Sequence, residues 1–221
     1  MFKRLSSSPS DVLIASEQLD RAIQQGDLEL AKLALRHRQV LNRPLRGVSV
    51  LMRAALAWLH HGSADSSLVD LLLKKGAWKS LTRDEQQTWL VTLVKDPEFP
   101  QSPRDLNIGG EVRLIALLDK LTAQGLDVNG VDAAGETALF EAVRRGHRRW
   151  TMALVAVGVN PAQPRHDGRY PHDMGIDQPQ VQSSPLWQEW LNLMRDQIQA
   201  TERQALLQKP SIKPGGRRLR G

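Results

Sequence analysis

The sequence predicts an all-α fold, a solenoid of four to five helix-turn-helix units that stack on one another. Apolar residues recur at helical spacing in successive short stretches, most regularly in residues 111–124. Glycines separate these stretches at a fixed interval. Gly125 and Gly158 close two helical stretches 33 residues apart. Gly135 and Gly168 stand in two turns with the same spacing. A period of this length, made of a turn and two helices, is typical of a repeat array.

One unit, residues 127–160, is the most complete and serves as the reference for the others. It contains the phrase Gly135-Glu-Thr-Ala-Leu-Phe-Glu-Ala142. This phrase resembles the ankyrin repeat pattern G-x-T-P-L-H-x-A, with alanine at the proline position and phenylalanine at the histidine position. The stretch GDLELAKLAL, residues 26–35, resembles the family's G-H-L-E-V-V-K-L-L-L. The chain is therefore similar to ankyrin repeat proteins over about residues 16–176.

The repeat pattern divides the chain into an N-terminal arm, an array and a C-terminal cap. Residues 1–14 are polar and rich in Ser and Pro, which predicts a flexible arm. The array covers residues 15–176, a capping helix covers 184–208, and a disordered basic tail covers 209–221. The units of the array, with β-turn fingers between them, are expected at about 15–46, 47–79, 80–130, 131–163 and 164–183.

Apolar spacing, helix-ending glycines and prolines place the helices within these units. The link between the two helices of the second unit, residues 60–67, is longer than in the fourth unit and indicates a surface insertion. The third unit holds Pro97, Pro100 and Pro103 in a loop, because proline is not tolerated in a helix interior. The expected helices cover about residues 15–25, 28–35, 68–75, 78–94, 111–124, 137–143, 148–157 and 186–207.

Composition excludes several classes of protein. No stretch approaches the ~20 apolar residues of a membrane span. The start, MFKRLSSSPSDVL, lacks the apolar core of a secretory signal. The chain has no cysteine, which excludes disulfides and thiolate metal sites and fits a reducing compartment. We therefore expect a cytoplasmic protein, and the sequence leaves delivery into a host cell open.

The resemblance implies a non-enzymatic module that binds a partner protein, as an adaptor, an effector or an immunity protein. In ankyrin-like arrays the turns project as fingers, the first helices line a concave face, and the second helices form the back. The resemblance implies no cofactor and no metal, and we expect a monomer in isolation. Carried over to the matching positions, the expected partner contacts are Gln24, Gln25, Val48, Leu56, Ala133, Ala134, Glu136, Arg144, Arg145, His166, Asp167 and Arg169.

A second interpretation is binding to nucleic acid or to an anionic surface. The net charge is +6, and the tail from Lys209 to Gly221 carries five basic residues and no acid. Four arginines also flank Gly146-His147, where the alternative is a solvated corner neutralised by neighbouring acids. The residues expected to bind an anion are Arg148, Arg149, Arg217, Arg218 and Arg220.

An enzyme is the least favoured interpretation. No phosphate-binding loop, nucleophile elbow or H-E-x-x-H sequence occurs in the chain. His60 and His61 lie near Asp65, but adjacent residues of a helix point about 100° apart and chelate poorly together. The sequence therefore favours a binding module.

Overall fold

The fold is all-α. The structure is a computed structural model, and it describes residues 8–61, 65–99, 109–176 and 185–208. Within these ranges the chain is mostly helical, with one isolated bridge, between Leu45 and Val48. The elements are α1 (Pro9–Gln25), α2 (Leu28–Ala34), the 3-10 helix η1 (Arg38–Asn42), α3 (Val50–His61), α4 (Ser67–Lys75), α5 (Arg83–Lys95), α6 (Gly110–Thr122), α7 (Ala138–Arg144), α8 (Arg148–Ala156), α9 (Asp173–Ile176) and α11 (Pro185–Gln208).

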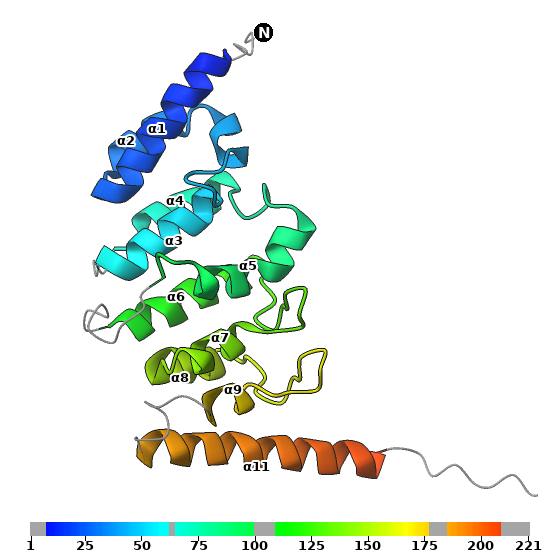
Figure 1. Ribbon diagram of the computed structural model, residues 1–221. Coiled ribbons are helices and arrows are strands. Elements are labelled where there is room, and N and C mark those ends of the chain that lie inside the picture. The colour runs from blue at the N-terminus through cyan, green and yellow to red at the C-terminus, as the bar shows by residue number, and fades with distance from the viewer. Residues whose placement is uncertain (1–7, 62–64, 100–108, 177–184, 209–221) are drawn as a thin grey trace, which may run out of the picture.

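The helices form a stack of layers that runs from the N-terminus to α11 (Figure 1). Successive layers contact one another: α1 packs on α2 and α3, α3 on α4 and α6, and α7 on α5, α8 and α9. The turns before α7 and before α9 project from the same side of the stack, at the right in Figure 1. The helix α11 lies across the end of the stack and extends past it.

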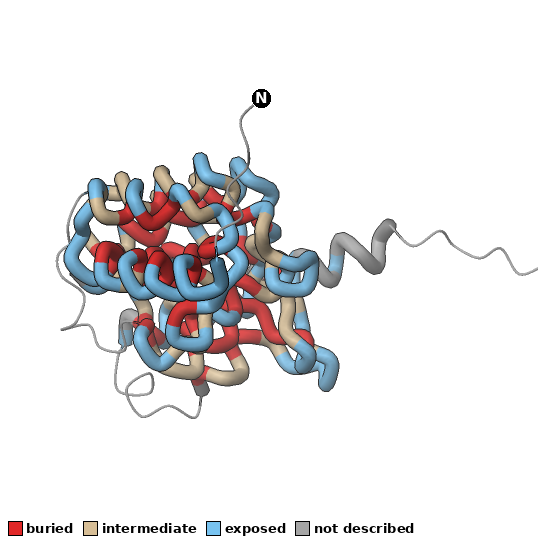
Figure 2. The backbone as a smooth tube through the Cα atoms, turned by 90° about the horizontal axis from the view of Figure 1, so that it is seen from above, coloured by how far each residue is buried: buried red, intermediate tan, exposed pale blue. Residues whose placement is uncertain are grey.

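The core runs through the whole stack, between its layers. Buried residues recur along successive helices in the interior, and exposed residues lie at the periphery (Figure 2). Large aromatic side chains join two successive layers. The ring centroids of Phe99, which follows α5, and Trp150, on α8, lie 4.8 Å apart. Trp187, Leu191, Met194 and Ile198 of α11 are buried, and so the helix covers the last layer.

The 33-residue period of the sequence recurs in the hydrogen bonds of the backbone. Gly125 and Gly158 adopt left-handed conformations, with φ of 99° and 96°. After each glycine the next amide donates to a carbonyl five residues back, at 3.0 Å from Leu126 to Leu121 and at 3.0 Å from Val159 to Leu154. Each projecting turn also contains an equivalent backbone hydrogen bond. In the first turn the amide of Asp132 donates to the carbonyl of Glu136, and in the second the amide of Arg165 donates to the carbonyl of Arg169. Both helix ends and turns therefore repeat every 33 residues.

Two helices begin at positions that the sequence analysis placed wrongly. The helix α1 starts at Pro9, not at Ala15, because Ser8 and Asp11 form a capping box ahead of it. Residues 9–14, which the prediction assigned to a flexible arm, are therefore helical. Residues 1–7 of that predicted arm lie outside the described residues. The helix α5 starts at Arg83, not at Trp78, because Thr82 and Glu85 form a second capping box.

Other differences concern the shorter elements. The 3-10 helix η1 was not predicted. Trp58, on α3, is buried at 8% exposure. The expected proline loop falls largely on residues 100–108, and the insertion on residues 62–64, and both segments lie outside the described residues, as does the basic tail.

We expect the Thr82→Ala variant to lose about 1 kcal/mol of the free energy of unfolding. The Thr82 hydroxyl accepts the amide of Glu85 at 3.3 Å, and the Glu85 carboxylate accepts the amide of Thr82 at 2.7 Å. Urea unfolding followed by circular dichroism measures the loss. Ser66→Ala is the matched control, because Ser66 precedes α4 without a side-chain hydrogen bond to that helix's backbone. Equal losses in both variants would contradict a capping role for Thr82.

Candidate functional site

The tips of the two projecting turns are exposed and lie side by side. Ala133 and Ala134 form the first tip, and His166, Asp167 and Arg169 belong to the second, and all five are exposed. The backbone amide of His166 donates to the carbonyl of Ala134 at 3.2 Å, which fixes one turn against the other. These five predicted contact residues therefore form part of one accessible surface.

A cluster of charged side chains supports these turns, and we call it the turn cluster. Its centre is Glu136, which is 4% exposed. Three cations approach its carboxylate: Arg144 at 2.6 Å, Arg165 at 2.8 Å and Lys95 at 3.1 Å. The members of the turn cluster are Lys95, Asp132, Glu136, Glu141, Arg144, Arg145, Arg165, Asp167 and Arg169.

The turn cluster connects three consecutive units. The Lys95 ammonium group, at the end of α5, also lies 2.6 Å from Asp132 in the first projecting turn. The carboxylate of Asp132 in turn accepts the backbone amides of Ala134 at 2.9 Å and of Glu136 at 3.0 Å. Arg165, from the second projecting turn, also pairs with Glu136. The position of each turn is therefore fixed by charges of the neighbouring layer.

Three predicted contact residues have a structural role in this cluster. Glu136 is buried, so the prediction that it contacts a partner is wrong for the chain in this state. Arg144 and Arg145 both pair with Glu141, and the side chain of Arg145 remains only 21% exposed. The arginine corner is therefore largely neutralised, which is the alternative that the sequence left open.

The electrostatics of the cluster favour the charged forms. Burial alone would raise the pKa of Glu136, but hydrogen bonds from Arg144 and Lys95 outweigh it and lower that pKa below its ordinary value. The pKa of Asp132 is likewise lowered against the effect of burial, mainly by Lys95. The pKa of Lys95 is raised by Asp132 and Glu136, although burial opposes this shift.

The residues expected to bind an anion do not gather at one described site. Arg149 is exposed, and its guanidinium lies 3.8 Å from the carboxylate of Glu111 on α6. Arg148 is half-buried at the start of α8. Arg217, Arg218 and Arg220 lie outside the described residues.

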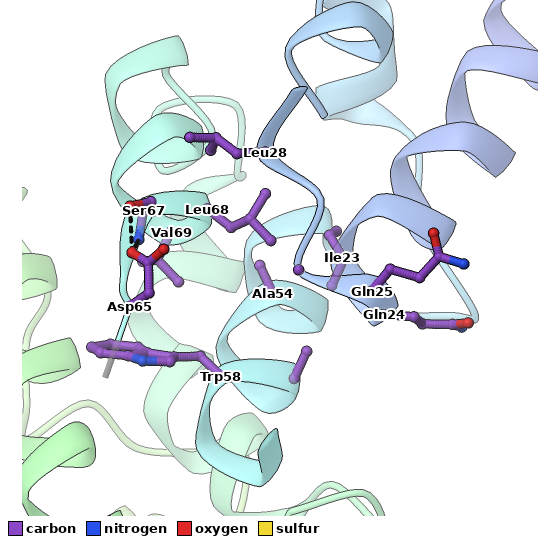
Figure 3. A pocket seen from close by; sticks show the side chains of 12 residues that line it. Ile23, Gln24, Gln25, Leu28, Ala54, Trp58, Asp65, Ser67, Leu68 and Val69 are labelled. Atoms are coloured by element: carbon purple, nitrogen blue, oxygen red, sulfur yellow. Dashed lines mark hydrogen bonds between the residues drawn. The ribbon is translucent and has the colours of Figure 1, made fainter. Parts of the chain in front are cut away.

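Gln24 and Gln25 lie apart from the projecting turns. They line a hollow of about 240 Å³ between the α1–α2 connection and the facing ends of α3 and α4 (Figure 3). Trp58 and Asp65 lie at the opposite side of this hollow from the two glutamines.

Val48 and Leu56 belong instead to a groove between the turn that precedes α3 and the helix α5. The groove has two hollows that share Val48, one of about 130 Å³ and one of about 230 Å³. Leu56 also lines the groove but is 1% exposed, so it offers little surface for the predicted partner contact. We call this feature the α5 groove, and its lining residues are Arg46, Gly47, Val48, Ser49, Met52, Arg53, Leu56, Leu81, Glu85, Thr88, Trp89, Thr92, Asp96, Pro97 and Glu98.

The ion pairs beside the α5 groove were not predicted from the sequence. Asp20 on α1 lies 3.2 Å from both Arg46 and Arg53. Arg53 also pairs with Glu98, which follows α5. Asp20 and Arg53 belong to consecutive units, and no local sequence pattern indicated that their side chains pair.

Comparisons with known proteins add no relative. No protein-family model matches the sequence, and no curated protein matches it either. Among the described residues, no group of three or more His, Asp or Glu side chains is placed to hold a metal ion. No described helix is long and apolar enough to cross a membrane. The projecting turns, the turn cluster and the α5 groove are therefore the candidate functional features of the described residues.

Proposed function

We propose that this chain is an ankyrin-like protein-binding module whose binding face comprises the turn tips and the α5 groove. The observation that carries the proposal is the continuity of these two features. Lys95 belongs to the turn cluster, and the next residue, Asp96, lines the α5 groove. The turn cluster, which supports the exposed tips, and the α5 groove thus adjoin at the end of α5.

Two further observations support the proposal. The sequence phrase of residues 135–142 resembles the ankyrin pattern, and the backbone hydrogen bonds of the turns repeat with the same 33-residue period. The turn cluster also holds both turns in place before any partner binds, which reduces the conformational entropy lost on association. A rigid, exposed surface of this kind suits recognition of a folded protein or of an extended segment.

Affinity purification from the native cell, followed by mass spectrometry, tests the function. A double variant, Ala133→Arg with Arg169→Glu, alters the exposed tips without replacing a buried side chain. We expect the purified partner to bind this variant at least about tenfold more weakly than the wild type, on the basis of lost contacts of 1.4 kcal/mol or more.

Asp119→Arg is the matched control, because Asp119 is exposed on α6 and belongs to neither the turn cluster nor the α5 groove. It should bind the partner as the wild type does. Equal affinity of the double variant and the wild type, with both folded by circular dichroism, would show that the turn tips are not the binding face.

A further inference from the structure

Exposed cations gather on the first two layers of the stack, away from the turn cluster. They belong to the segment around η1 and to the segment that ends α4 and leads to α5, both on the side of the stack from which the turns project (Figure 1). The Ser80 hydroxyl group of the second segment donates to the carbonyl of Leu41 in η1 at 3.4 Å, so the two segments are in contact. The members of this feature, which we call the basic surface, are Arg36, Arg38, Arg43, Lys74, Lys75 and Lys79, all exposed.

The charge of the basic surface is not compensated by acids. Residues 30–64 and 71–83 contain neither Asp nor Glu. None of the six cations forms an ion pair with a residue that the structure describes. The next acid in the chain, Asp84, directly follows Arg83, and these two charges offset each other. The six cations therefore repel one another, and an anionic ligand would relieve this repulsion.

The basic surface lacks the apolar groups that anchor a protein or a membrane. The apolar residues that stand between its cations, Val40, Leu41, Ala77 and Trp78, are buried. No large exposed hydrophobic side chain belongs to residues 36–43 or 74–79, all of which the structure describes. Protein interfaces have aromatic or apolar anchors and are depleted in lysine, and insertion into a membrane surface requires apolar side chains. The basic surface therefore suits a polar ligand of high negative charge.

We propose that the basic surface binds the phosphate backbone of double-stranded nucleic acid without reading its sequence. Guanidinium and ammonium groups are the main donors to phosphate oxygens, and side-chain amides such as those of the exposed Gln39 and Asn42 also bind them. Single strands are bound by aromatic side chains on which the bases stack. Trp78, the only Trp, Tyr or Phe of the two segments, is buried, which favours a duplex. This inference does not depend on the proposed function.

The extent of the basic surface fits the charge density of a duplex. Packed helices lie about 8–10 Å apart, so the cations of two successive layers span about that length. A duplex carries one phosphate charge per about 1.7 Å of its axis, which gives about five charges over the same length. The two segments can therefore contact several phosphates of one duplex, and each contact releases counterions from it.

Fluorescence anisotropy of labelled duplexes of mixed sequence, with the full-length chain, tests this inference. A DNA duplex and an RNA duplex of the same sequence distinguish the two sources of the phosphate backbone, and we expect binding to at least one of them at low salt. The double variant Arg38→Gln with Lys79→Gln removes one exposed cation from each segment. It should bind at least about tenfold more weakly at low salt, and the slope of log affinity against log salt concentration should fall by about 2.

The matched control is the double variant Arg195→Gln with Arg203→Gln. Both residues are exposed on α11, at the opposite end of the stack, and the control removes the same net charge. It should keep the affinity and the salt dependence of the wild type, and circular dichroism confirms that each variant is folded. Equal effects of the two double variants would show that net charge alone determines binding, and they would overturn the inference. Absence of duplex binding by the wild type at low salt would also overturn it.

Three other results would assign the binding elsewhere. If deletion of residues 209–221 abolishes duplex binding while Arg38→Gln with Lys79→Gln has no effect, the basic tail is the binding site. If that double variant weakens capture of a purified protein partner but not of a duplex, the ligand is an acidic protein. If the chain sediments with vesicles that contain phosphatidylserine but binds neither duplex, the ligand is a membrane. Each of these results would overturn the inference and leave the turn-tip experiment to decide the proposed function.

Discussion

The Gly130→Ala variant is expected to lose about 3 kcal/mol or more of the free energy of unfolding. A Cβ atom at Gly130 would lie 1.9 Å from the carbonyl oxygen of Gln87 and 3.0 Å from its carbonyl carbon. Both are backbone atoms of α5, so no side-chain rotation relieves the overlap. The segment after α6 would have to move away from α5, which separates packed layers.

Gly158→Ala is the matched control for this variant. Gly158 has φ of 96°, and a Cβ atom there would meet no atom within 4 Å. Its replacement should cost only about 1–2 kcal/mol, the strain of a left-handed alanine. Urea unfolding of both variants measures the difference. A loss at Gly130 no larger than at Gly158 would show that α5 and this segment do not lie in contact.

Gly130 also shows which parts of the fold the sequence predicted. The 33-residue period identified Gly125, Gly135, Gly158 and Gly168, whose left-handed conformations recur. The helices α6, α7 and α8 were placed within one or two residues, whereas α9 was not predicted. Gly130 gave no such signal. Its constraint comes from the approach of Gln87, more than forty positions earlier in the chain, and local pattern carries no information on that contact.

The helix starts at Ser8 and Thr82 were, in contrast, predictable from local sequence. Each is followed three positions later by an acidic residue, Asp11 or Glu85, which is the spacing of a capping box. The predicted starts of these two helices were instead based on the spacing of apolar residues. Periodicity locates the buried stripe of a helix, whereas capping residues locate its end, because they satisfy the first backbone amides.

Within the candidate site, the sequence predicted the exposed turn tips but not which of the other residues are buried. The turn tips at Ala133, Ala134 and His166 are exposed, as a terminal turn position implies. Glu136 and Leu56 were carried over from equivalent positions but are buried. Lys95 and Arg165 reach Glu136 from neighbouring units, 41 and 29 positions away, and long-range ion pairs of this kind follow from the packing of layers.

The Glu136→Gln variant is expected to lose about 2 kcal/mol at neutral pH. The change removes the charge that Lys95, Arg144 and Arg165 share, while the shape of the side chain is kept. Removing one partner of a buried pair costs about 3–5 kcal/mol. The cost is smaller here because the three cations are 26% to 36% exposed, and water solvates them in the variant.

The matched control is Glu29→Gln on α2. The Glu29 side chain is 81% exposed and pairs only with Lys32 three positions on, at 2.6 Å. Such a surface pair is worth about 0.5 kcal/mol or less. Thermal and urea unfolding of both variants at neutral pH measure the two losses. Similar losses would indicate that Glu136 contributes no more than an ordinary surface charge.

The pH dependence identifies the charge of Glu136 as the cause. The pKa of Glu136 is lower in the folded chain than in the unfolded chain, where a glutamate has a pKa of about 4.3. Its contribution is therefore complete above about pH 4.3 and is lost as the pH falls through the lower, folded value. The stability difference between the wild type and Glu136→Gln should accordingly narrow in acid. A difference that stays constant from about pH 7 to pH 3 would assign the loss to packing and remove the electrostatic account of the turn cluster.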